Sequence, residues 1–461
     1  MGNVKVPASA YYGAQTQRAL DNFQVSGLVF PRRFIRALGI VKHVAAHVNM
    51  QLGLLDQKKA KAIAQAAQEV TDGKFDREFL VDIFQTGSGT STNMNANEVI
   101  ANRAIELQGG TRGDKRVVHP NDDVNMSQSS NDVFPTAIHI SAVEALVTDL
   151  LPALKNLALA LDKKADEFSD VVKPGRTHLQ DAVPITLGQE FSGYQGCLER
   201  AADWIETAAN ELRELNLGAT AVGTGLNAGD QYVERAVANL SRDTGLTLRP
   251  AKNLFRVTQS MGDVAAYSGS LRRLAVELGK IASDLRLLSM GPRAGLSEIT
   301  LPAVQPGSSI MPGKVNPSVP EMVNQVCFQA IGCDATVAAA AEAGQLELNV
   351  MMPVIAWNAI HASTILREAM IALRTRTVEG IEANAERCRE LLDWSTAAAT
   401  ALSPYIGYAA TADIAKEAVR TGRPIREIVL ERGLLDAKRL DAILSVEAMT
   451  KPGIAGKREG R

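Results

Sequence analysis

Four long stretches combine helical periodicity with apolar residues, and they constrain the fold more than any other feature of the chain. They are residues 149–168, 188–215, 268–288 and 320–341. The last two are apolar around most of their circumference, and such helices must be buried in a large core or in a bundle shared between subunits. Alternating β-branched and aromatic runs, which are typical of strands, are scarce and short. The sequence therefore predicts an all-α protein.

The length of the chain predicts more than one domain. At 461 residues it is too long for one ordinary hydrophobic core. We expect an amino-terminal helical domain over residues 1–128, a central long-helix bundle over residues 129–383 and a small helical domain over residues 384–461.

Charge and cysteine usage exclude several functional classes. With 49 basic and 51 acidic residues, the chain lacks the electrostatic footprint of a nucleic-acid-binding or membrane-surface protein. No apolar run of about 18 residues and no amino-terminal signal pattern are evident, so we expect a cytoplasmic protein. The 4 cysteines lie far apart without C-x-x-C spacing, which indicates reduced, buried thiols and neither a metal site nor a disulfide framework. We expect no cofactor.

The segment 307–316, with the sequence GSSIMPGKVN, concentrates polar chemistry in ten residues. Gly307, Ser308 and Ser309 provide a flexible turn with two hydroxyl groups and free backbone N–H groups. Lys314 and Asn316 follow closely, and together these donors form a nest for a carboxylate. A surface turn with an incidental lysine is the alternative for any short piece of the segment, whereas the whole segment favours a site.

Polar, glycine-rich breaks separate the expected helices, among them residues 86–97 and 173–184, which we expect to be loops. A histidine lies in the second of these, in the segment GRTHLQD at residues 175–181. A lone histidine is more often structural than catalytic. The polar setting of His178 favours proton transfer, for which histidine is the usual residue near neutral pH. Glu321, in the helix after the Lys314 segment, would orient the imidazole. Its alternative role is that of a carboxylate favourably placed at a helix N-terminus.

Further segments add hydroxyl and amide donors. Residues 86–93 precede a helix, so their N–H groups can point at an anion, although a plain helix cap explains this segment alone better. Residues 119–123 and 127–132 are likewise turn-like and cap-like in isolation. The Gly-Thr-Gly at residues 223–225 is a weak nucleotide signal, because no strand precedes it and no Walker lysine follows.

Taken together, these segments resemble the fumarase/aspartase superfamily. GSSIMPGKVNP is the signature of that family, and TGSGTSTNMNANEV, HPNDDVN, SQSSND, GRTHLQDA and GTGLN accompany it in the family's order. The resemblance covers almost the whole chain. It implies a three-region helical subunit whose long central helices form a twenty-helix core in a homotetramer. It also implies active sites that each draw loops from three subunits.

The resemblance assigns roles to matching positions. It implies Ser308 as the base that removes the carbon-bound proton, and His178, with Glu321 beside it, as the partner in proton transfer to the leaving group. The residues expected to bind the dicarboxylate are Ser88, Gly89, Thr90, Ser129, Ser130, Asn131, Thr177, Ser309, Lys314 and Asn316. A secondary anion site is implied at His119, Pro120, Asn121 and Asp122.

Different segments of the chain favour different leaving groups, water in some and ammonia in others. Ser88, Ser130 and His119 resemble fumarases, because aspartases more often have Ala and Thr at the first two positions. Residues 320–325, 342–346 and 449–454 look more like bacterial aspartases. Since the first set would touch the substrate, the expectation is a class II, metal-independent fumarate hydratase of the tricarboxylic acid cycle. The alternatives are an aspartate ammonia-lyase and a non-catalytic helical scaffold.

Overall fold

The computed structural model describes residues 2–457. It is 63% helical, which confirms the all-α expectation. The longer helices are α1 (Ala14–Asn22), α2 (Arg32–Gln51), α3 (Gln57–Thr71), α4 (Thr90–Leu107), α5 (Ser130–Ala145), α6 (Leu151–Glu167), α7 (Leu187–Ala209), α8 (Tyr232–Thr244), α10 (Gly262–Leu288), α11 (Ser318–Glu342), α12 (Met352–Arg376), α13 (Ala385–Trp394) and α15 (Tyr408–Thr421). Short helices are α9 (Leu254–Gln259), α14 (Ser403–Ile406), α16 (Ile425–Glu431), α17 (Ala437–Ile443) and α18 (Val446–Met449).

Single helical turns and short strands complete the described part of the chain. The turns are η1 (Asp76–Glu78), η2 (Gly87–Gly89), η3 (Pro120–Val124), η4 (Leu146–Leu150), η5 (Glu211–Arg213), η6 (Val378–Gly380) and η7 (Ala397–Leu402). Strands β1 (Val172–Thr177) and β2 (Gln180–Thr186) form an antiparallel pair, as do β5 (Ile299–Thr300) and β6 (Glu382–Ala383). Strands β3 (Glu214–Leu215) and β4 (Arg249–Pro250) are parallel.

The chain divides into two compact units. The first contains Met1–Pro152, Ala201–Val276 and Val326–Glu368, and the second contains Ala153–Arg200, Glu277–Gln325 and Ala369–Arg461. The long helices α7, α10, α11 and α12 contribute residues to both. The three-region division expected from the sequence, with boundaries near residues 128 and 383, stays a prediction.

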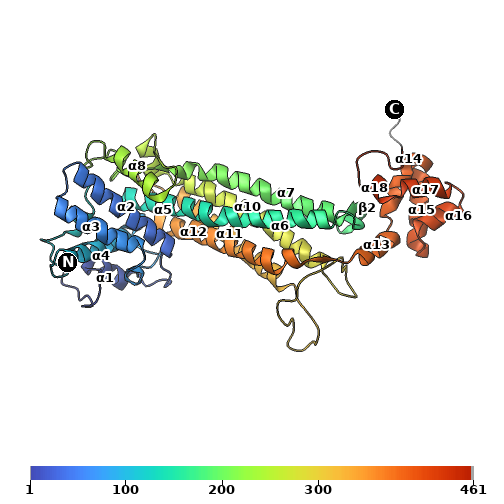
Figure 1. Ribbon diagram of the computed structural model, residues 1–461, viewed down its shortest axis with the longest axis horizontal. Helices are drawn as coiled ribbons and strands as arrows, with labels where there is room; N and C mark the ends of the chain where they lie inside the picture. Colours follow the sequence, from blue (N-terminus) through green and yellow to red (C-terminus); the bar gives the residue numbers. More distant parts are fainter. Residues whose placement is uncertain (1, 458–461) are drawn as a thin grey trace. The chain divides into compact units, whose positions relative to one another are not determined.

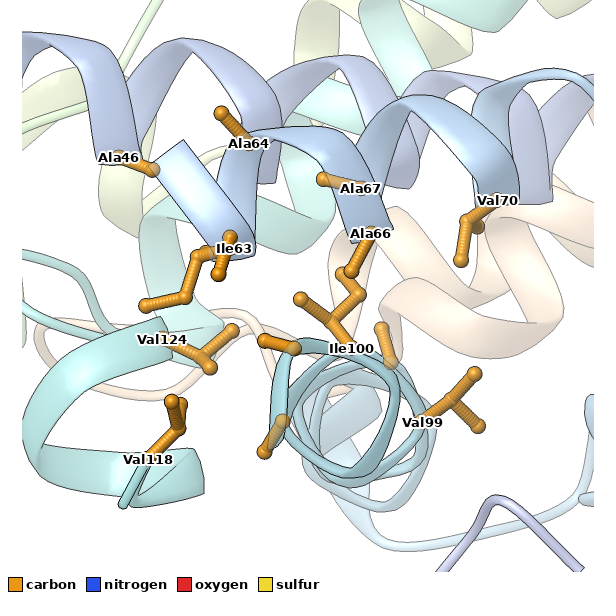
Figure 2. Packing of buried hydrophobic residues seen from close by; sticks show 14 of the residues in the cluster. Ala46, Ile63, Ala64, Ala66, Ala67, Val70, Val99, Ile100, Val118 and Val124 are labelled. Carbon is orange, nitrogen blue, oxygen red and sulfur yellow. The ribbon is translucent and has the colours of Figure 1, made fainter. Parts of the chain in front are cut away.

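In the first unit, α3 packs between α2 and α4 (Figure 1). Helix α3 is rich in alanine, and small side chains allow close helix approach. Figure 2 shows Ile63 and Ala66 of α3 pointing toward α4, where Ile100 lies in the same buried cluster. Asp56 caps the amino terminus of α3 by accepting hydrogen bonds from two backbone N–H groups. This packing holds α4, whose first residue is Thr90.

In the second unit, the carboxyl-terminal helices α15, α16 and α17 lie close together (Figure 1). They contribute Ile414, Ile428 and Leu440 to a small buried hydrophobic cluster. The β1–β2 hairpin belongs to the same unit. Helix α13 contacts β1, and α18 contacts β2. Each strand of the hairpin is therefore packed against a helix, whereas the residues at its tip, 177–180, are exposed.

The structure confirms the four predicted helices and corrects several boundaries. The helix expected over residues 188–215 ends at Ala209, because residues 214–215 pair with β4 instead. Residues 173–184, expected to be a polar loop, form most of the β1–β2 hairpin. Residues 90–97, also placed in a glycine-rich break, belong to α4. In each case, long-range pairing or capping overrides the local composition.

The helical run Ser130–Glu167 passes a length and hydropathy test for a membrane span, which the sequence analysis did not anticipate. However, 72% of its most apolar window is buried inside the structure. That burial is typical of a core helix, and the run contributes Phe134, Ile138 and Leu154 to the buried side chains.

Candidate active site

The segment that joins β5 to α11 carries Ser308, Lys314 and Asn316, and it closes on itself. Asn316 Nδ2 donates a hydrogen bond to the carbonyl oxygen of Gly307 over 2.6 Å. A Cβ atom added at Gly307 would lie 2.2 Å from the carbonyl oxygen of Lys314, so only glycine allows the two sides of the loop to approach this closely. The Ser308 Oγ accepts hydrogen bonds from the backbone N–H groups of Ile310 (3.3 Å) and Met311 (3.0 Å).

A cavity of about 750 Å³ opens beside this loop, within the second unit. Lys314, Asn316 and Glu321 line it together with Arg286 from α10, whereas Ser308 does not. Among residues 2–457, no hydrogen bond or ion pair engages the Lys314 ammonium group, which leaves it available to an anion. Arg286 donates to Asn324 Oδ1 over 3.0 Å and adds a second positive charge to the cavity wall.

His178 occupies the tip of the β1–β2 hairpin. His178 and Leu179 form its two-residue turn with φ angles of 56° and 59°. Turns of this kind usually contain Asn and Gly, because the left-handed region is strained for other residues by about 1–3 kcal/mol each. Such strain persists where the surroundings hold it in place, and it is concentrated at functional sites. Among the described residues, no hydrogen bond links His178 to Glu321 or to Ser308, so that pairing stays a prediction.

A buried ionic cluster holds the base of this hairpin. Glu298, which is fully buried, lies 2.7 Å from Lys173 Nζ and 2.9 Å from Arg176 Nη1. Lys173 Nζ also donates to Glu190 Oε2 over 2.6 Å. Lys173 and Arg176 both belong to β1, so the cluster fixes the strand that presents His178. The Cys388 thiol donates to the Glu298 carbonyl oxygen over 3.5 Å, and burial raises the pKa of Cys388 to about 12.

In the first unit, Ser88 and Gly89 lie in the turn before α4, and Thr90 is the first residue of that helix. Ser88 has a φ angle of 55°, and its N–H donates to the carbonyl oxygen of Val350 over 2.7 Å. Gly89 has a φ angle of 69°, and a Cβ atom there would lie 2.1 Å from Phe134 Cδ2. Glycine is therefore required on both conformational and steric grounds. The hydroxyl oxygens of Ser88 and Thr90 lie 3.3 Å apart.

Ser129, Ser130 and Asn131 lie at the amino terminus of α5. Ser129 and Asp132 form a capping box, in which Ser129 Oγ accepts from the N–H of Asn131 and Asp132 Oδ1 accepts from the N–H of Ser129. Asn131 Nδ2 donates to the carbonyl oxygen of Ala221 over 2.8 Å. The Ser130 Oγ accepts from Asn93 Nδ2 of α4 over 3.4 Å. The α4 and α5 termini predicted to bind substrate thus come together.

Asp132 also anchors the neighbouring 218–220 segment. Its Oδ2 accepts from the N–H groups of Gly218 and Thr220 at 2.9 and 3.0 Å. Burial raises the pKa of Asp132 to about 6, although these backbone donors oppose the shift.

His119 caps the amino terminus of the single turn η3. Its side chain accepts hydrogen bonds from backbone N–H groups that could otherwise donate to a bound anion. Its Nδ1 accepts from the N–H groups of Asn121 (3.2 Å) and Asp122 (3.1 Å). The Asp122 carboxylate lies 3.3 Å from the same nitrogen. The secondary anion site expected here stays a prediction.

The sequence-predicted residues therefore form two groups, one in each unit. In the first, Ser88 lies beside Thr90, and Ser130 is joined to α4 through Asn93; in the second, Lys314, Asn316 and Glu321 line one cavity. Sequence reasoning missed Arg286 and the Glu298 cluster. Neither has a local motif, because their partners are distant in sequence. Within residues 2–457, no group of three or more His, Cys, Asp or Glu side chains is arranged to hold a metal ion.

Comparison with known families gives two matches. A lyase family profile matches residues 2–332, and a profile for the fumarase C carboxyl terminus matches residues 399–451. A class II fumarate hydratase from Halobacterium salinarum is 52% identical over 98% of this chain and 96% of its own length. An aspartate ammonia-lyase from a Bacillus species is 48% identical over 99% of this chain and 98% of its own length.

Solved structures give the same result. A fumarate lyase:delta crystallin from Brucella melitensis, bound to cobalt, superposes with a TM-score of 0.93 at 50% identity, covering 97% of each chain. A class II fumarase from Schistosoma mansoni superposes with a TM-score of 0.94 at 41% identity, also covering 97% of each chain. Overall identity does not separate the two activities, since hydratase and ammonia-lyase relatives are similarly close.

Proposed function

We propose that this chain, which belongs to the fumarase/aspartase superfamily of lyases, reversibly adds water to fumarate to give (S)-malate. The observation that carries the proposal is the place of two serines at the adjoining termini of α4 and α5: Ser88 lies beside Thr90, and Ser130 accepts a hydrogen bond from Asn93 of α4. Both positions are of the fumarase type. They provide small hydroxyl groups where the substrate and the attacking or leaving water would be bound.

The hydrogen bonds of Ser130 suit this role. Its oxygen accepts from Asn93, which leaves the O–H free to donate to a substrate oxygen. Thr90, whose hydroxyl oxygen lies beside that of Ser88, adds another hydroxyl group at this terminus. A water or hydroxyl leaving group both donates and accepts hydrogen bonds, and serine hydroxyls can complement either role.

Ser308 is the proposed base. A neutral serine is a weak base, so its oxygen must be activated by nearby donors. The backbone N–H groups of Ile310 and Met311 already donate to Ser308 Oγ, and such donors favour the alkoxide over the neutral hydroxyl. The loop geometry thus supports proton abstraction from the carbon next to a carboxylate.

Lys314 and Asn316 are the proposed binding groups for the reacting carboxylate. Removing the proton builds a dianionic aci-carboxylate, which is very unfavourable in water. Fixed donors stabilise that charge without reorganising, and removing one from a comparable site costs roughly 10²–10³ in rate. The Lys314 ammonium can supply such a donor, and Arg286 raises the positive charge around the same cavity. His178 is the proposed proton donor to the leaving hydroxyl, with Glu321 as its orienting partner.

Assembly as a homotetramer in the cytoplasm, with a place in the tricarboxylic acid cycle, is part of the same proposal. Support for assembly comes from apolar side chains on the long helices. Phe328 of α11 and Val276 of α10 are 68% and 54% exposed in the isolated chain. A large aromatic side chain so exposed on a core helix indicates that another surface covers it.

One assay tests whether the enzyme adds water or ammonia to fumarate. Purified enzyme is mixed with fumarate in ammonia-free buffer, and the loss of fumarate absorbance is followed while NMR identifies the product. We expect malate to form at the same rate whether potassium or ammonium is the added cation. Ser308→Ala enzyme prepared identically corrects for contaminating host activity. Consumption that requires ammonium and yields aspartate would replace this proposal with an aspartate ammonia-lyase.

A scaffold without catalysis is the remaining alternative. Ser308, Lys314, Asn316, His178 and Glu321 are all retained in the sequence, which argues against it. Absence of turnover with both water and ammonium, in enzyme that is folded and binds no dicarboxylate, would favour the scaffold.

A further inference from the structure

Lys42, near the middle of α2, is fully buried, and among residues 2–457 no carboxylate forms an ion pair with it. Its side chain has 0% exposure, and Nζ donates to two amide oxygens, Asn125 Oδ1 and Gln128 Oε1, each over 2.9 Å. Lysine is almost never fully buried unless it is paired with an opposite charge. A buried ammonium bound to neutral amides is therefore costly, and its position requires a reason.

The Asn125 side chain is the centre of a hydrogen-bonded cluster. Besides Lys42, Asn125 Oδ1 accepts from Asn93 Nδ2 over 3.1 Å and from Asn97 Nδ2 over 3.2 Å. Asn125 Nδ2 donates to the Gln128 carbonyl oxygen over 3.1 Å. One amide oxygen thus joins α2, α4 and the segment that leads into α5.

This cluster reaches the proposed substrate-binding residues. Asn93 donates both to Asn125 and to the Ser130 hydroxyl oxygen. Gln128, which directly precedes Ser129, also donates through Nε2 to the carbonyl oxygens of Val124 and Met126. The turn that presents Ser129 and Ser130 is therefore held on its buried side by the cluster that Lys42 completes.

We propose that Lys42 is a positioning residue for dicarboxylate binding, which acts by fixing Asn125 and Gln128 so that the Ser129–Ser130 turn is preorganised. The inference rests on the proposed function only in assigning Ser129 and Ser130 to the substrate. It does not depend on whether water or ammonia leaves. Preorganised groups bind without the entropic cost of ordering them, so loss of Lys42 weakens binding before it slows chemistry.

The charge environment is consistent with this role. Burial lowers the pKa of Lys42 to about 7, and the buried Asp132 carboxylate opposes that shift. Buried groups with strongly perturbed pKa values occur preferentially at functional sites. There, the free-energy cost of burying them is offset by the residues that they hold in position.

The test compares Lys42→Met with Lys59→Met. Lys59 lies on α3, pairs with Asp123 over 2.8 Å at a partly exposed position, and takes no part in the cluster, so it is a matched control. The probe is succinate, a dicarboxylate that cannot react, with binding measured by calorimetry. We expect Lys42→Met to raise the succinate Kd and the fumarate KM about tenfold or more with a smaller change in kcat. Lys59→Met should change each less than twofold.

A second variant and a double-mutant cycle distinguish a positioning role of Lys42 from a general loss of folding. Gln128→Met removes one acceptor from Lys42 at a less buried position, and we expect a smaller increase in the succinate Kd. Because Gln128 and Lys42 belong to one cluster, their double variant should show a non-additive change. Folded Lys42→Met or Gln128→Met enzyme with wild-type succinate affinity would overturn the inference. If the wild-type enzyme itself binds no succinate and turns over no fumarate, the proposed function fails first.

Discussion

Replacing Glu298 by Gln should test how the hairpin that presents His178 is held. Glu298 is fully buried, and each of its carboxylate oxygens faces a cation, Lys173 at 2.7 Å and Arg176 at 2.9 Å. The substitution keeps the size of the side chain, removes its charge and replaces one acceptor oxygen by an NH2 donor. Lys173 retains Glu190 at 2.6 Å, whereas in the described part of the chain Arg176 retains only the Pro174 carbonyl oxygen, at 3.4 Å.

The magnitude follows from burial. Removing one partner of a buried ion pair costs about 3–5 kcal/mol, because an uncompensated charge remains out of water. Since Lys173 keeps a second carboxylate, we expect the lower end of that range, about 3 kcal/mol. Glu447→Gln is the matched control, because Glu447 pairs with Lys451 over 2.6 Å on the exposed face of the same unit. Solvent screens such a pair, so its loss should have little effect.

The assay is equilibrium unfolding in urea, followed by circular dichroism, with hydrogen exchange of the β1 and β2 backbone amides as the local measurement. We expect Glu298→Gln to lower the unfolding midpoint and to speed exchange across the hairpin, whereas Glu447→Gln should leave both near wild type. Equal effects of the two substitutions would refute the reasoning that burial makes this cluster an anchor.

Three further predictions follow from the loops and the buried lysine. Ser308→Ala should lower kcat by about 10²–10⁴-fold with little change in melting temperature, and His178→Asn should cost less; steady-state kinetics that reverse this ranking would make His178 the main base. Gly307→Ala places a Cβ atom 2.2 Å from the Lys314 carbonyl oxygen, so we expect loop displacement and a loss of about 100-fold in kcat, while unchanged kcat would show that the loop tolerates the shift. Because folding lowers the pKa of Lys42 from 10.5 to about 7, the unfolded chain binds more protons between those values, and wild-type stability should rise with pH across that window. Denaturation of Lys42→Met enzyme across the same pH range should lack that component, and an identical rise in both proteins would contradict it.

The sequence predicted the helices because their signal is local. Periodic apolar residues locate both ends of α6 and α11 closely, and one end each of α7 and α10, whose other ends differ by about six residues. The dense Gly, Ser, Lys and Asn content of residues 307–316 predicts a binding loop before any contact is known. The same reasoning predicted a loop where the hairpin lies. The turn at His178 and Leu179 has none of the Asn or Gly that usually indicates two left-handed residues, so only the tertiary structure reveals it.

The chemical character of a side chain can be read from the sequence at its own position. The contacts that hold it in place come from residues far apart in the chain. Ser130 is visible in the sequence, but the cluster behind it joins Lys42, Asn93 and Asn125, which no local spacing connects. Glu298 likewise lies more than a hundred positions from the strand it anchors. The sequence by itself determined which groups can do chemistry, because residue type and periodicity are properties of short segments. Only the tertiary structure decided which of them are held in place, because buried charges and shared hydrogen bonds form only when distant helices pack.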